Sequence, residues 1–379
     1  MTSRWQWTAM LVLGLGTALV AQGDAPKGIA VGSLDRTCKP CDDFWRFANG
    51  AWVDANPIPA AYSSWGPSQI LAQRNRDGMR TILDGLAGDR SSGANTNEGR
   101  LADFYGSCMD KGTINRRGLD PLKPELAQID AIRTPDDLRA LLVRYQPAGR
   151  PFLTNNGAVI GFFRFTSGVD PQNPSRVIAR LVERDSAGRT PSSILSMPDR
   201  DYYIRDDAKT QATRAEFLGH MEKLLTLAGS ASAAAEARTV LAFETTLAKA
   251  ALSNADRREP ERVYHPMSLE RVQQLAPNFD WQALLRDAGV PASTVINVSE
   301  PELIQAGNRL IAETPLTDWK TWLRWRALKT AAPYLAEGFA AEDFRFERTV
   351  LAGVAEPLPR WETCAQLVDR DLSDAIGAL

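Results

Sequence analysis

Histidine is almost absent from this chain, and its scarcity excludes most hydrolytic metal sites. Only two histidines occur among 379 residues, His220 and His265. Neither opens an H-E-x-x-H sequence, because His220 is followed by MEKLL and His265 by PMSLE. A hydrolytic zinc ion usually takes two or three histidines and keeps an open coordination position. The sequence therefore predicts no zinc site, and we expect both histidines to be packed or surface residues.

Cysteine is also scarce, with four residues in the whole chain. Cys38-Lys39-Pro40-Cys41 has the C-x-x-C spacing of a redox pair, but such a pair needs a preceding strand within a βαβ pattern, and only a polar spacer precedes Cys38. A zinc ribbon would need a second C-x-x-C, whereas Cys108 and Cys364 stand alone. The four cysteines are therefore expected to be structural or unpaired.

Other signatures of catalysis and of nucleic-acid binding are missing as well. The chain has no G-x-S-x-G elbow, and the glycine-containing run LGLGT belongs to the apolar leader, so it is not a phosphate-binding loop. Lys and Arg number 44 against 46 acidic residues, so the net charge of −2 offers no basic surface for nucleic acid. The residues alone predict neither a catalytic group nor a metal ligand.

The N-terminus has the pattern of an export signal. Arg4 precedes an apolar run, Thr8–Ala21, and small residues follow it, with possible cleavage after Gly23 or Ala25. A membrane span needs about 20 apolar residues, and this run is shorter. We interpret residues 1–23 as a signal peptide and 24–34 as a spacer, which predicts a periplasmic or secreted protein in an oxidising compartment. The alternative is a protein anchored in the membrane by an uncleaved leader.

The remaining sequence is predominantly helical in its periodicity. Thr134 followed by Pro135 predicts a helix start, and Trp319, Trp322 and Trp325 recur on one helical face, which favours a core position. Only the region around residues 158–184 is β-rich, with turn residues in its middle, and it predicts a β-hairpin. The expected fold is mainly α: one multi-helix domain over residues 35–379 with a small antiparallel hairpin.

Two local features complete the pattern. The stretch CKPCDDFWRFANGAW predicts a first helix that is capped by Asp42 or Asp43 and packed by its aromatic residues, which are Phe44, Trp45, Phe47 and Trp52. Asn297-Val298-Ser299 fits a glycosylation sequon, although three residues alone are weak evidence.

An ordered set of motifs resembles the N-terminal portion of the neprilysin and endothelin-converting-enzyme family of zinc metallopeptidases, in its bacterial form. From Asp35 to Leu379 the set runs CDDFWRFANGAW, LADFYGSCMD, GLDPLKPEL, LSMPDRDYYI, VLAFETTLAKA, YHPMSL, NFDW and PRWETCAQLV. The resemblance implies a helical lid-type domain that covers a catalytic domain, with the substrate in the cavity between them. In the family the zinc ligands and the general-base glutamate come from a downstream H-E-x-x-H half.

The resemblance also carries implications for single residues. It implies that Cys108 bonds Cys364, and that the family partner of Cys41 lies near a distant C-terminus, so that Cys41 bonds Cys38 locally or stays free. Members that release dipeptides hold a peptide's terminal carboxylate with an Arg and a nearby Asp. The matching positions here are Ser64 and Gln69, which favours internal cleavage of oligopeptides by the parent enzyme.

The resulting hypothesis is the lid domain of a secreted zinc metalloendopeptidase, itself incomplete at its C-terminus. Such a chain would carry no cofactor, would be inactive alone, and would have the missing catalytic domain and an oligopeptide substrate as partners. The alternative is a stand-alone exported helical protein that binds a peptide or a partner; a periplasmic solute-binding protein has no residue-level support. A lid domain should expose a large apolar patch, and a stand-alone protein should not.

Overall fold

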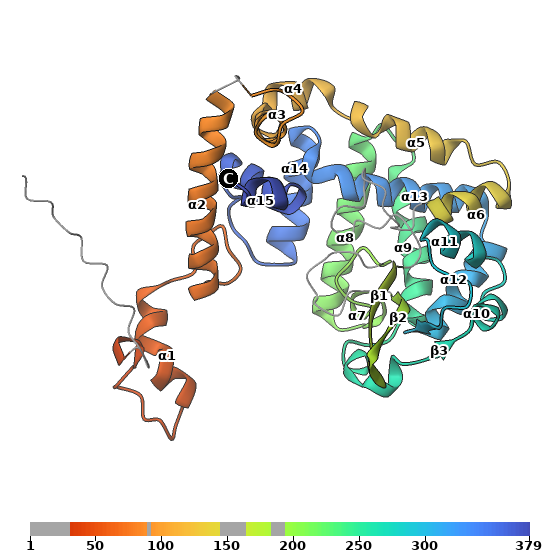
Figure 1. Cartoon of the computed structure of the whole chain (residues 1–379), viewed down its shortest axis with the longest axis horizontal. Helices are drawn as coiled ribbons and strands as arrows, with labels where there is room; N and C mark the ends of the chain where they lie inside the picture. Colours follow the sequence, from red (N-terminus) through yellow and green to blue (C-terminus); the bar gives the residue numbers. More distant parts are fainter. Residues whose placement is uncertain (1–30, 89–91, 145–163, 183–193) are drawn as a thin grey trace, which may run out of the picture. The chain divides into compact units, whose positions relative to one another are not determined.

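A computed structural model describes residues 31–88, 92–144, 164–182 and 194–379 (Figure 1). The expected signal peptide, residues 1–23, and most of the spacer lie outside the described residues. The chain divides into two compact units between Ile58 and Pro59. This boundary falls inside the stretch that the sequence predicted to form one domain.

The first unit contains a short 3-10 turn, η1 (Val31–Ser33), and one helix, α1 (Phe44–Ala55). Asp43 caps α1 as expected, because its side chain accepts a hydrogen bond from the Arg46 backbone N–H. Gly50 allows close packing inside the unit, since a Cβ there would lie 2.7 Å from the Cβ of Asp35.

Two aromatic residues of α1 differ from the expectation that they pack the first helix, whereas Phe47 and Trp52 are half-buried. Phe44 and Trp45 are 69% and 62% exposed. The physical reason is the small size of this unit, because one helix and one turn supply no second layer to cover a helix face.

The second unit is built mainly from helices, and it begins before α2. Its α-helices are α2 (Pro67–Gly88), α3 (Asn97–Met109), α4 (Lys111–Arg117), α5 (Lys123–Asp130), α6 (Pro135–Arg144), α7 (Asp201–Ile204), α8 (Ala208–Leu227), α9 (Ala233–Ala250), α10 (Leu269–Leu275), α11 (Trp281–Asp287), α12 (Pro301–Glu313), α13 (Leu316–Ala331), α14 (Glu337–Asp343), α15 (Arg360–Asp371) and α16 (Ser373–Gly377). A π-helix, Phe344–Val350, continues α14, and short 3-10 turns are η2 (Asp120–Leu122), η3 (Asp256–Arg258), η4 (Pro260–Arg262) and η5 (Ala332–Tyr334).

Helix ends follow the capping chemistry of the sequence. The predicted start at Thr134 is confirmed, because its hydroxyl accepts a hydrogen bond from the Asp137 N–H at 3.2 Å. Thr96 and Asp207 cap α3 and α8 in the same way. Within the described part of the chain, no helix combines the length and the apolar character needed to cross a bilayer.

The small sheet is larger than the predicted hairpin. Strands β1 (Arg164–Asp170) and β2 (Asn173–Val182) pair antiparallel, which confirms the hairpin for its described part. Two short strands, β3 (Pro266–Met267) and β4 (Ile296–Val298), extend it to the order β1-β2-β4-β3, with β2 and β4 parallel. The sequence did not reveal β3 and β4, because two or three residues show no periodicity.

The second unit has two separate hydrophobic cores. The larger core contains the fully buried Trp319, Trp322 and Trp325 of α13, which confirms the predicted core face. The smaller one joins Leu83 of α2 and Leu101 of α3 to α15 and α16, and α2, α3 and α15 lie side by side in Figure 1. The early and late helices of this unit therefore share a core that the intervening helices do not enter.

Candidate functional site

The cysteines occupy two different environments. Cys108 at the end of α3 and Cys364 in α15 form a disulfide with a Cα–Cα distance of 5.7 Å. Cys38 and Cys41 are free thiols, so the local bond between them is not formed. The Cys38 Sγ lies 3.5 Å from the backbone carbonyl oxygen of Asp43 instead. The first pair links the helices of the smaller core.

Ser64 and Gln69, the candidates for lining a substrate cavity, lie close together in the chain before and at the start of α2. Ser64 is exposed and Gln69 is half-buried. Neither forms a side-chain hydrogen bond with another described residue. The segment that carries them therefore has free polar groups but no charged group at either of these two positions.

A polar cluster that the sequence did not reveal fixes this segment to α15. The Tyr62 hydroxyl donates to Glu362 Oε1 at 2.7 Å, and the Arg76 guanidinium donates to the same oxygen at 2.8 Å. Burial, together with the hydrogen bond to Glu362, raises the pKa of Tyr62. Trp65 packs edge-on against the Tyr62 ring at 4.8 Å. The segment before α2 is thus hydrogen-bonded to α15, although its partner lies 300 residues away in the sequence.

A second network is buried inside the larger core around Glu244 of α9. Its carboxylate is fully buried and accepts hydrogen bonds from the Ser196 N–H at 2.9 Å, the Tyr203 hydroxyl at 2.6 Å and the Trp322 indole N–H at 3.2 Å. Because several donors satisfy this charge, the network joins α7, α9 and α13. It is enclosed, and it offers no open position for a substrate.

His220 is packed in the interior, as one of the two alternatives expected. It is fully buried, its Nδ1 lies 3.0 Å from Glu342 Oε1, and its ring stacks on Phe346 at 4.6 Å. Burial lowers the pKa of this imidazole. His265 lies beside β3 and β4, with its Nδ1 3.1 Å from the backbone carbonyl oxygen of Val298. Both rings therefore have structural contacts.

Glu342, which contacts His220, and the adjacent Asp343 have opposite electrostatic environments. Burial opposes ionisation of Glu342, but hydrogen bonds from His220 and Arg345 outweigh it and bring its pKa to about 2. Burial raises the pKa of the neighbouring Asp343 to about 7, and the attraction of Lys329 only partly offsets this. These groups lie where α14 passes into the π-helix.

The described residues do not fit a hydrolytic zinc ion. Within them, no three His, Cys, Asp or Glu side chains lie together as a metal would require. A buried ring nitrogen of His220 faces Glu342, and His265 faces a backbone carbonyl. No hydrolytic step through zinc can be derived from these side chains.

The sequon at Asn297 is not presented to solvent. Asn297 lies in β4, is 4% exposed, and its Nδ2 donates to the Val263 carbonyl oxygen at 2.9 Å. Its Oδ1 accepts from the His265 N–H at 2.6 Å. The folded protein thus uses this amide to hold the sheet, in place of a glycosylation role.

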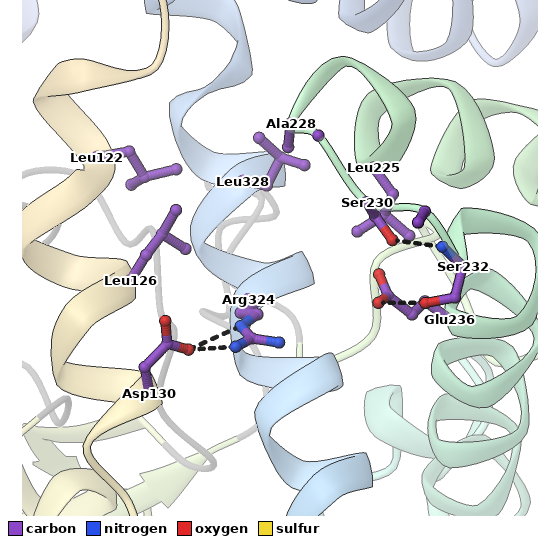
Figure 2. A pocket seen from close by; sticks show the side chains of 12 residues that line it. Leu122, Leu126, Asp130, Leu225, Ala228, Ser230, Ser232, Glu236, Arg324 and Leu328 are labelled. Carbon is purple, nitrogen blue, oxygen red and sulfur yellow. Dashed lines mark hydrogen bonds and ion pairs between the residues drawn. The ribbon is translucent and has the colours of Figure 1, made fainter.

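A pocket of about 320 Å³ opens between α5, α13 and the α8–α9 connection (Figure 2). Leucine side chains and Ala228 form its apolar part, and Figure 2 shows Asp130 and Glu236 on opposite sides of it. Sequence patterns contain no sign of this pocket, because its walls come from three separate segments.

Comparisons with known proteins agree on one family. A family model described as peptidase family M13 matches residues 40–379. Endothelin-converting enzyme 1 of Rattus norvegicus is 25% identical over 365 residues, covering 92% of this chain and 44% of that relative. An endothelin-converting enzyme homolog of Locusta migratoria is 28% identical over 360 residues, covering 91% and 48%.

Solved structures show the same fold. The zinc metalloprotease Zmp1 of Mycobacterium tuberculosis, in complex with an inhibitor, matches with a TM-score of 0.79 and 26% identity, covering 92% of this chain and 51% of that one. PepO from Lactobacillus rhamnosis HN001 has a TM-score of 0.69 at 17% identity, covering 90% and 51%, a likeness that shows the fold alone. The chain spans about half the length of the relatives that it matches.

Proposed function

The chain belongs to peptidase family M13, and on that premise we propose that it is the N-terminal lid-type part of a zinc metalloendopeptidase that cleaves oligopeptides. The observation that carries the proposal is the match of the family model to residues 40–379, together with similarity to an endothelin-converting enzyme and to a zinc metalloprotease. The reaction of the complete enzyme would be zinc-assisted hydrolysis of peptide bonds.

In this proposal the chain supplies a wall of the substrate cavity and limits substrate size, and the catalytic groups come from the other half. The commitment of both histidines to internal contacts supports this division of labour. The absence of a charged side chain at Ser64 and Gln69 supports internal cleavage, because a terminal carboxylate would find no cation at those two positions.

We propose that the exposed face of α1 contacts the catalytic half. Phe44 and Trp45 lie largely in solvent, and an exposed aromatic patch indicates an interaction site. Cys41 is exposed and free, so it is available for the disulfide that the family resemblance implies with a distant cysteine. These features favour the lid domain over a stand-alone exported protein.

Export is part of the same proposal. The leader over residues 1–23 has the charge and apolar pattern of a signal peptide. The disulfide between Cys108 and Cys364 is typical of an oxidising compartment. A periplasmic or secreted location would meet both requirements.

The test is an assay of the purified 379-residue chain with an internally quenched oligopeptide, with added zinc and with EDTA, and with thermolysin as the positive control. We expect no EDTA-sensitive hydrolysis and no stoichiometric zinc by elemental analysis, because no described side chains form a ligand set. Stoichiometric zinc with EDTA-sensitive cleavage would overturn the proposed division of labour. Specific peptide binding by a monodisperse chain without cleavage would favour the stand-alone alternative.

A further inference from the structure

One wall of the pocket in Figure 2 is a tight helix end that local hydrogen bonds close. α8 ends at Leu227, and the connection to α9 is closed by a hydrogen bond from the Ser230 N–H to the Leu225 carbonyl oxygen at 3.0 Å. Gly229 has φ of +89°, a conformation that side chains rarely adopt, which allows this tight helix end. The Ser230 hydroxyl then accepts from the Ser232 N–H at 3.1 Å. The wall is thus fixed by local hydrogen bonds before any ligand arrives.

The floor of the pocket is apolar. Leu122, Leu225 and Leu328 are almost fully buried, with 2%, 4% and 2% of their surface exposed, and Leu126 is half-buried beside them. These leucines come from η2, α8, α13 and α5, so the floor is part of the larger core. An unbranched aliphatic chain laid on this floor would leave water, and the affinity would rise with each methylene that becomes buried.

The rim of the pocket is polar, and its net charge is negative. Arg324 donates to one oxygen of Asp130, which neutralises one acid. Glu236 receives only the Ser232 hydroxyl, at 3.0 Å on Oε1, among the described residues. Its other oxygen, Oε2, has no hydrogen-bond partner there. An anionic ligand would meet this second, uncompensated carboxylate, whereas a cation would be attracted to it.

We propose that this pocket binds a small organic cation, a primary ammonium group on an unbranched aliphatic chain. The ammonium donates to Glu236 Oε2, and the chain lies across Leu126 and Leu328. Both parts are needed: a short polar cation does not reach the leucines, and a neutral alcohol leaves the carboxylate without a charged partner. This site is separate from the proposed peptidase function, and neither depends on the other.

The test is calorimetric titration of the full chain with hexylammonium at pH 7.5 and constant ionic strength. Hexan-1-ol, hexanoate and methylammonium are the matched probes, because each lacks the charge, its sign or the chain. We expect hexylammonium to bind at least tenfold more tightly than each of them, since one hydrogen bond to a charged group or two methylenes corresponds to about that factor.

Two variants locate the binding. Glu236→Gln keeps the shape of the side chain but removes its charge, and we expect it to weaken hexylammonium binding about tenfold. Glu222→Gln changes an exposed acid on α8 outside the pocket and should leave the affinity unchanged. The proposal is overturned if hexylammonium does not bind, if hexanol or hexanoate binds as tightly, or if both variants weaken binding equally.

Discussion

His220, Glu342 and Asp343 show how neighbouring residues acquire different charge states in one interior region. His220 comes from α8, while the two acids end α14. Glu342 stays ionised because His220 and Arg345 donate hydrogen bonds to it. Asp343, with its pKa raised to about 7 by burial, has no such hydrogen bond among the described residues. At neutral pH this acid is therefore a source of instability.

The first prediction concerns Asp343. Folding raises the pKa of this carboxyl group from 3.8 to about 7. The stability that it contributes is therefore fully present below the unfolded pKa, and it is lost as the pH rises from about 4 to about 7. We expect Asp343→Asn to raise the free energy of unfolding relative to wild type at pH 8, by up to about 4 kcal/mol, and much less at pH 4.5. Urea unfolding of both proteins at the two pH values measures this.

The relevant quantity is the difference in the free energy of unfolding between wild type and Asp343→Asn, because His220 changes the stability of both proteins with pH in the opposite direction. Its lowered pKa makes the protein lose stability as pH falls below about 6.5. The control is Asp103→Asn, which changes an exposed acid on α3 and should alter the free energy of unfolding at pH 8 by no more than about 0.5 kcal/mol. An equal effect of Asp343→Asn at both pH values would refute the raised pKa.

At this scale the sequence predicted residue environments better than residue partners. The aromatic and aliphatic neighbours of His220 in α8 indicated a packed or surface histidine, because helical periodicity places them on one face. Glu342 lies 122 residues away, and local periodicity contains no information about a contact over that separation. The same limit applies to Tyr62 and Glu362, which contact each other across 300 residues.

Secondary-structure elements are joined in the interior by polar side chains as well as by apolar packing. Glu244 of α9 accepts hydrogen bonds from the segment before α7, from Tyr203 of α7 and from Trp322 of α13. The Trp325 indole N–H donates to the Ser196 hydroxyl at 2.8 Å, which extends the network. One buried acid therefore sets the relative positions of three helices.

The second prediction tests this network. Glu244→Ala would remove the acceptor of three buried donors, the Ser196 N–H, the Ser196 hydroxyl and the Tyr203 hydroxyl, and each such loss costs about 1–3 kcal/mol. We expect a loss of at least about 3 kcal/mol in the free energy of unfolding, measured in urea. Glu244→Gln, which keeps one acceptor oxygen, should cost less. The control is Glu222→Ala at an exposed site, which should change the free energy of unfolding by no more than about 0.5 kcal/mol. If Glu222→Ala and Glu244→Ala lowered it equally, the network around Glu244 would not be a special source of stability.

Elements were predictable from sequence when they were long and periodic. The α13 tryptophans repeat every three residues and were correctly placed in the core. The hairpin was visible because β-rich runs flank turn residues. β3 and β4 were not predicted because tertiary pairing, of β4 with β2 and of β3 with β4, makes them strands, and local propensity does not. The exposure of Phe44 and Trp45 also escaped it, since a pattern shows which residues are apolar but not whether a second layer covers them.

At the scale of the whole molecule, the first and last helices of the second unit pack against each other. Its early helices α2 and α3 and its late helices α15 and α16 share the smaller core, while the residues between them build the larger one. The disulfide between Cys108 and Cys364 closes a sequence separation of 256 residues within this arrangement. Arg360 strengthens the junction by donating to the Cys108 carbonyl oxygen at 2.9 Å.

The third prediction concerns this covalent link. In the chain-entropy model, a disulfide that closes so long a loop contributes about 5 kcal/mol by restricting the unfolded chain. We expect the double variant Cys108→Ser, Cys364→Ser to lower the free energy of unfolding by an amount of that order, as measured by urea unfolding. The matched control is Cys38→Ser, Cys41→Ser, which removes two free thiols and should have no comparable effect. Equal losses in the two double variants would show that the link does not stabilise the fold.

The most direct test of the proposed role is to read the coding DNA immediately beyond the Leu379 codon. If the chain is the N-terminal part of an M13 peptidase, the reading frame continues and encodes an H-E-x-x-H sequence, whose two histidines can hold the zinc ion that the described residues do not fit. A stop codon directly after Leu379 would contradict this account and leave a stand-alone helical protein as the better description.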